Sequence, residues 1–210
     1  MNVAALLALA AVVVLGSPAR AAEPARPTAL GPTTVVDVMS ISFEPNDITI
    51  APGTTISWRN DTTPDRVHDV VSSVTDYFLS PRFRSGESYQ YRFTAAGSFG
   101  YVCSIHDVMI GVVHVPLSGR SEADDQGPLM RIRLATRALS VGSDFRYVVR
   151  RRDPGSPVFQ RWLFTRAAEL TFRPTMPGTY DFTMRIKNVA TGEKTGTSGD
   201  SPVLSLDWPG

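Results

Sequence analysis

The chain has 210 residues, 42% of them hydrophobic, and a formal net charge of +1 at pH 7. This composition excludes a disordered chain and a strongly basic nucleic-acid binder, and the length suffices for one or two domains with packed cores. Sixteen glycines, sixteen prolines and few helical patterns favour an all-β fold, and a single cysteine excludes an internal disulfide.

The N-terminus carries an export pattern. Residues 3–15 form an apolar run, and the small-residue triplet Ala19-Arg20-Ala21 follows. This pattern predicts a signal peptide over residues 1–22, with a retained membrane anchor as the alternative. No later segment is apolar enough to span a membrane. We therefore expect an exported protein, periplasmic or extracellular, in which residues 23–34 form a flexible leader.

Short alternating segments separated by turn residues fill most of the remaining chain and predict strands. The first set is expected over residues 35–41, 47–50, 55–59, 88–93, 97–103 and 110–115. The polar segment SGRSEADDQGP, residues 118–128, has the composition of a linker. The second set is expected over residues 129–135, 145–151, 159–164, 169–173, 179–187 and 203–208. The sequence thus predicts two β domains, residues 35–117 and 129–210.

Metal-ligating residues gather in the segment YVCSIHDVMIGVVHV, residues 101–115. Cys103, His106 and Met109 have a Cys-x2-His-x2-Met spacing between two predicted strands, so one tight loop carries all three. A thiolate, imidazoles and a weak thioether suit copper in both oxidation states, whereas zinc prefers more cysteines and rarely takes methionine. His68 is the candidate for a second imidazole. The alternatives are a buried inert cysteine and an ordinary loop histidine.

The third histidine is not expected to bind metal. His114 alternates with Val113 and Val115 in a predicted strand, which indicates a surface position. Three histidines in the whole chain are too few for a multicopper oxidase or a copper nitrite reductase. We therefore expect a mononuclear copper protein that is not an enzyme.

The segment from about Val38 to Val115 resembles the plastocyanin/azurin-like cupredoxins. The resemblance rests on ISFEPNDITIAPGTTISWRND, VHDVV and GSFGYVCSIHDVMIGVVHV, and the short His-x2-Met spacing is most similar to amicyanin. It implies a Greek-key β-sandwich, with one type 1 copper ion bound by the residues His68, Cys103, His106 and Met109.

The family's role, as the resemblance implies it, is single-electron transfer between redox proteins such as a small cytochrome or an oxidoreductase. The exposed edge of His106 is the expected electron portal, ringed by Ile105, Val108 and Ile110. Two acidic residues depart from the family pattern. Asp69 follows His68 where asparagine is common, and Asp107 stands where amicyanin-like loops often carry proline.

The second half resembles an immunoglobulin- or fibronectin-type β-sandwich in AELTFRPTMPGTYDFTMRIKN, residues 168–188. Tyr180 is the candidate for a corner tyrosine, whose hydroxyl bonds to backbone. This half holds no histidine or cysteine and no aromatic-interleaved basic motif, so nucleic acid is not an expected partner. A cell-surface or extracellular interaction module, in which copper is secondary, is the alternative function.

Overall fold

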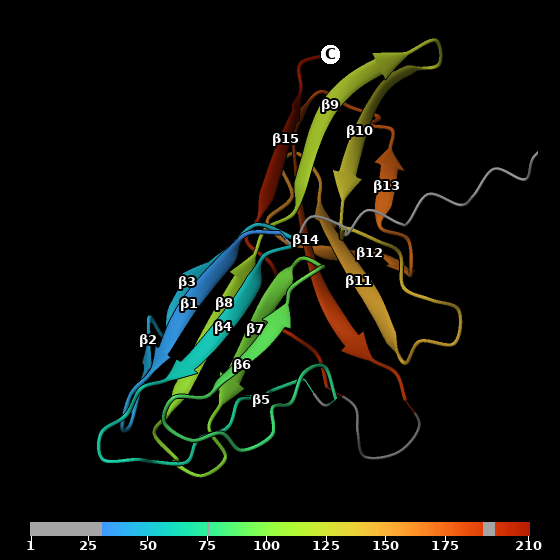
Figure 1. The fold of residues 1–210 in the computed structure, drawn as a ribbon. Coiled ribbons are helices and arrows are strands. Elements are labelled where there is room, and N and C mark those ends of the chain that lie inside the picture. Colours follow the sequence, from blue (N-terminus) through green and yellow to red (C-terminus); the bar gives the residue numbers. More distant parts are fainter. Residues whose placement is uncertain (1–30, 75, 191–195) are drawn as a thin grey trace, which may run out of the picture. The chain divides into compact units, whose positions relative to one another are not determined.

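The computed structural model describes residues 31–74, 76–190 and 196–210. Residues 31–210 belong to one compact unit. All regular elements of the described residues are strands, which confirms the all-β prediction, and none is a helix that could cross a membrane (Figure 1). The predicted signal peptide, residues 1–22, and most of the predicted leader lie outside the described residues.

Two four-stranded sheets make up the first half. One has the order β2-β1-β4-β6 and the other β3-β8-β7-β5. Their strands are β1 (Thr33–Val38), β2 (Phe43–Glu44), β3 (Asp47–Thr49), β4 (Thr55–Asn60), β5 (Val71–Ser72), β6 (Ser88–Arg92), β7 (Gly97–Val102) and β8 (Ile110–Val115). β1 pairs with β4, and β3 with β8, in parallel. The six predicted strands are present with slightly shifted ends, and only the two-residue β2 and β5 were not predicted.

Alternation along β7 directs the end of this strand into the core. Phe99 and Tyr101 point inward and are buried, while Ser98, Gly100 and Val102, which alternate with them, are partly exposed. Tyr101 meets the buried Trp58 edge-on, with ring centroids 5.3 Å apart. Because side chains alternate with period two, Cys103 continues the inward-facing row just beyond the strand. The fold thus delivers the only cysteine of the chain to the interior.

The second half also consists of two sheets, with the orders β13-β10-β9 and β12-β11-β14-β15. Their strands are β9 (Ser118–Asp124), β10 (Gly127–Arg133), β11 (Phe145–Arg152), β12 (Gln160–Thr165), β13 (Glu169–Phe172), β14 (Gly178–Asn188) and β15 (Leu204–Trp208). All six strands predicted here are present. Tyr180 donates a hydrogen bond to the carbonyl oxygen of Met176 at 2.9 Å, as expected of a corner tyrosine. The immunoglobulin-like nature of this half stays a prediction.

The segment 118–128, predicted to be a linker, instead forms β9 and the start of β10. The two strands pair from Gly127 opposite Asp124 to Arg133 opposite Ser118. β9 lies at the edge of its sheet and its side chains are almost all exposed. Its polar composition therefore reflects solvent exposure of a strand and not a flexible connection, and only Pro116 and Leu117 separate it from β8.

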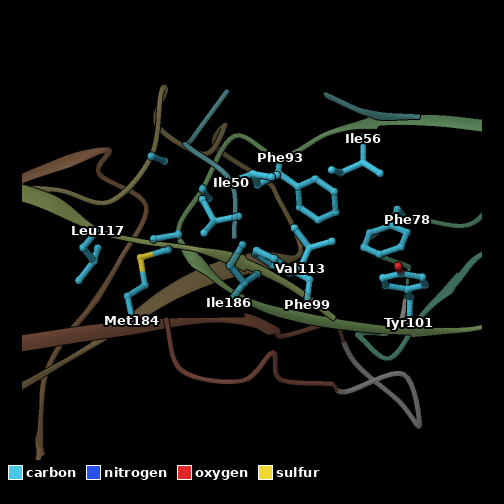
Figure 2. Close-up of a cluster of buried hydrophobic side chains, with 14 of the residues drawn as sticks. Ile50, Ile56, Phe78, Phe93, Phe99, Tyr101, Val113, Leu117, Met184 and Ile186 are labelled. Carbon is cyan, nitrogen blue, oxygen red and sulfur yellow. The ribbon is translucent and has the colours of Figure 1, made fainter. Parts of the chain in front are cut away.

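The two halves share one hydrophobic core. Met184 and Ile186 of β14 lie in the same buried cluster as Phe99 and Val113 of the first half (Figure 2). Backbone hydrogen bonds also cross the junction, from Ala96 N to Leu134 O at 2.8 Å, from Thr136 N to Thr94 O at 2.7 Å, and in both directions between Ser98 and Gly199. Burial and backbone pairing together hold the halves in contact.

Candidate metal centre

Three of the four predicted ligands meet at one point. The ligand atoms of His68, Cys103 and His106 all lie within 4.8 Å of one another. The sulfur of Cys103 is 3.9 Å from Nδ1 of His68 and 3.5 Å from Nδ1 of His106. Two ligand atoms at about 2.0 and 2.3 Å from one ion, 120° apart, are separated by about 3.7 Å. The three donors are thus spaced for trigonal coordination of a single ion.

His68 is held in place by backbone pairing and by a buried asparagine. It exchanges two backbone hydrogen bonds with Phe83, of 3.0 and 2.9 Å. The side-chain amide of Asn60, at the end of β4, donates to the carbonyl oxygens of Arg66 and Phe83. Its Oδ1 accepts from the backbone and hydroxyl of Thr62. Sequence reasoning missed this anchor, although Asn followed two residues later by Thr is a signal of an Asx turn.

The loop that carries the other ligands closes on itself. Met109 N donates to His106 O, and Cys103 N donates to Met109 O, each at 3.0 Å. The Met109 side chain is fully buried. These contacts fix the loop between β7 and β8 and leave Met109 in the interior, three residues after His106 in sequence. Its role as the axial ligand stays a prediction.

Position 111 has no room for a side chain. A Cβ atom on Gly111 would lie 2.3 Å from Cζ of Tyr101 and 2.5 Å from its hydroxyl oxygen. Tyr101 is itself buried and packs on Trp58. A methionine at position 111, in β8, therefore does not fit in this fold.

The chain matches the profile of copper-binding proteins of the plastocyanin/azurin family over residues 32–116. It is 30% identical to amicyanin-alpha of Methylorubrum extorquens over 114 residues, which cover 53% of this chain and 93% of that protein. The chain belongs to the plastocyanin/azurin family. It is also 32% identical to amicyanin of Paracoccus denitrificans over 83 residues (39% and 63% covered). With plastocyanin of Scenedesmus fuscus the identity is 33% over 82 residues (33% and 80%).

The donor set of this cupredoxin fits copper. Cys103 is 2% exposed and His68 is fully buried, so neither side chain is hydrated. Burial, followed by the like charges of His106 and Arg66, lowers the pKa of His68, and a neutral imidazole is the form that binds metal. One thiolate and two imidazoles make a type 1 copper site, and all three residues lie within the matched residues 32–116.

A buried carboxylate braces the two ligand-bearing loops. Asp69 is 6% exposed and accepts two hydrogen bonds from Ser104, from the backbone N–H at 2.6 Å and from the hydroxyl at 2.5 Å. It follows His68, and Ser104 follows Cys103, so the brace joins the neighbours of two ligands. Sequence reasoning noted the unusual aspartate but not its partner, because 35 residues separate them.

His114 lies apart from the metal cluster, as predicted. It is half-buried, and its Nδ1 is 2.7 Å from Oγ of Ser98, while its Nε2 is 3.3 Å from Oδ1 of Asp47. The hydroxyl of Ser98 donates to the carbonyl oxygen of Asp200 at 2.6 Å. His114 therefore belongs to a polar network at the junction of the halves.

Proposed function

We propose that this protein carries single electrons between redox proteins at one copper ion. Copper bound by a thiolate and imidazoles supplies the chemistry, because it is stable as both Cu(I) and Cu(II) in such a site. Electron carriage is also what the cupredoxin resemblance implies. Met109 is assigned as the weak axial ligand that completes the set with His68, Cys103 and His106.

The unequal exposure of the two histidines carries this proposal. His68 is fully buried, whereas His106 is partly exposed. Around His106 in sequence, Ile105, Val108 and Ile110 expose 37%, 68% and 61% of their surface. An imidazole edge set among exposed apolar side chains gives a partner a dry contact close to the metal. His106 would thus act as the electron portal.

A rigid ligand frame favours fast electron exchange. The backbone pairing of His68 with Phe83, the loop hydrogen bonds around Met109 and the Asp69–Ser104 brace hold the donors near their coordinating positions. Side chains that are already placed need not rearrange when the charge of the ion changes. This arrangement supports a carrier.

We further propose that the chain itself is not an enzyme and that it is exported. Its three histidines do not suffice for a second, catalytic copper centre. The export proposal rests on the apolar run at residues 3–15 and is tested by mass spectrometry of the chain recovered from fractionated cells. A chain that begins near residue 22 or 23 supports export, and a full-length chain in the cytoplasmic fraction contradicts it.

Titration of the metal-free protein with Cu(II), followed by visible absorption and EPR, tests the centre. We expect an intense thiolate-to-copper band that saturates at one equivalent, with narrow copper hyperfine splitting. Cys103→Ser must abolish this band. No band in a folded protein with reduced Cys103, or a band that survives Cys103→Ser, would rule out the assignment.

Stopped-flow reduction of the copper-loaded protein by a small exported cytochrome tests the carrier role. We expect rapid exchange that slows when Val108→Asp places a charge beside His106. An unchanged copper spectrum in that variant would show that the effect lies in docking. Exchange that is slow in the wild type and insensitive to this substitution would favour the interaction-module alternative.

A further inference from the structure

A cleft opens at the junction of the two halves, away from the metal ligands. Its enclosed part has a volume of about 180 Å³ and is lined by residues of both halves. Tyr77, Tyr91 and Ala95 come from the first half, and Phe145, Tyr147 and Ile186 from the second. A wider outer part of about 490 Å³ shares Tyr91 and Arg137 with it.

The walls of the cleft are already fixed. Tyr77 of the first half meets Phe145 of the second edge-on, with ring centroids 5.4 Å apart. The backbone bond from Thr136 N to Thr94 O, both in the outer part, ties the halves at this point. A cavity that is shaped before binding costs a ligand little ordering of the protein.

The cleft is positively charged and has no acidic residue among its described lining residues. Arg137 lies in both parts, and its guanidinium makes no ion pair or hydrogen bond with another described residue. Arg92 lines the outer part and bonds through Nε only to the carbonyl oxygen of Gly53. Two guanidinium groups that have no carboxylate partner among the described residues favour an anion.

Three phenols complete the lining as neutral donors. Burial raises the pKa of Tyr77 well above its ordinary value, that of Tyr91 above it, and that of Tyr147 to about 12. Tyr91, Arg137 and Tyr147 line the enclosed part together, and the Tyr147 hydroxyl donates to the backbone carbonyl oxygen of Arg137 at 3.4 Å. Tyr91 lines both parts of the cleft, and its neutral hydroxyl can donate a proton to a ligand there.

We propose that this cleft binds a small aromatic carboxylate. An apolar cavity of about 150 Å³ holds a benzene ring, so the enclosed part is large enough for one ring among Tyr77, Phe145 and Ile186. The carboxylate would pair with the Arg137 guanidinium and accept from the Tyr91 hydroxyl, where the enclosed part meets the outer part. This site is independent of the copper centre.

Calorimetric titration of the full chain with benzoate tests the site, with acetate and benzamide as probes that lack the ring or the charge. We expect saturable one-to-one binding of benzoate, weakened at least about tenfold for acetate and benzamide. Arg137→Gln should weaken benzoate binding by about the same factor. Arg133→Gln is the matched control, because this exposed arginine lies outside the cleft and faces Glu169 at 3.6 Å.

Tyr91→Phe removes only one hydroxyl and should weaken benzoate binding severalfold while leaving the unfolding temperature nearly unchanged. The proposal is overturned if benzoate and acetate bind alike, if no saturable binding is found, or if Arg137→Gln and Arg133→Gln have equal effects. Equal effects of the two arginine substitutions would mean that benzoate binds only through the general positive charge of the surface.

Discussion

The buried carboxylate of Asp69 should lower the reduction potential of the copper centre, and Asp69→Asn should raise it. Both carboxylate oxygens accept hydrogen bonds from Ser104, which fits the ionised form. Asparagine has the same shape, can accept from the backbone N–H of Ser104 and can donate to its hydroxyl. The substitution therefore removes one negative charge while keeping the brace between the loops.

The magnitude follows from position and burial. Asp69 bonds to the backbone nitrogen that follows Cys103, so its charge lies about 7 Å from an ion on the Cys103 sulfur. At an effective dielectric constant of about 20, two unit charges at that distance interact by about 2.4 kcal/mol. For a one-electron couple this corresponds to about 100 mV. Loss of the carboxylate destabilises Cu(II) more than Cu(I), so the potential rises.

Asp107→Asn is a matched control, because Asp107 also follows a ligand histidine but is exposed. In a water-like dielectric the same charge at a comparable distance changes the reduction potential by only about 25 mV, and salt screens this effect further. Protein-film voltammetry at low and high salt measures both variants, and their visible spectra check that the copper site is intact. A shift in Asp69→Asn no larger than that in Asp107→Asn, with unchanged spectra, would refute the reasoning.

Three other substitutions test separate parts of the structure. Met109→Leu should keep a coloured Cu(II) site and raise its potential in voltammetry, since a weak axial donor to Cu(II) is lost; an unchanged potential would mean that Met109 is not axial. Gly111→Ala should destabilise the metal-free protein in urea by about 1–3 kcal/mol, because its Cβ would overlap the Tyr101 ring, and wild-type stability would contradict that packing. Burial by itself raises the pKa of Asp200, but hydrogen bonds and charges, first those of Arg185, outweigh it and lower the pKa. Its contribution to stability is therefore present above the unfolded-state value of about 4 and is lost as the pH falls through the lower folded value. Asp200→Asn should be less stable at pH 7 and lose less stability on acidification, as urea unfolding at each pH would show; parallel pH profiles would contradict the ion pair's role.

The sequence alone determined the strands and most of the ligand set. Alternation of apolar and polar residues is local, so twelve predicted strands appear in the structure with shifted ends. Cys103, His106 and Met109 occupy seven consecutive residues, and a loop that short keeps them close whatever the rest of the chain does. Copper followed from the chemistry of those side chains.

Tertiary structure alone decided the features that join distant segments. His68 reaches the site because its backbone pairs with Phe83, and the Asp69–Ser104 brace spans 35 residues. β9 is a strand only because β10 provides its hydrogen-bond partners, since its polar side chains do not alternate in burial. The continuous core and the tyrosine-lined cleft likewise depend on how the two halves pack. Such contacts arise from the global arrangement of the chain, so a local sequence pattern does not predict them.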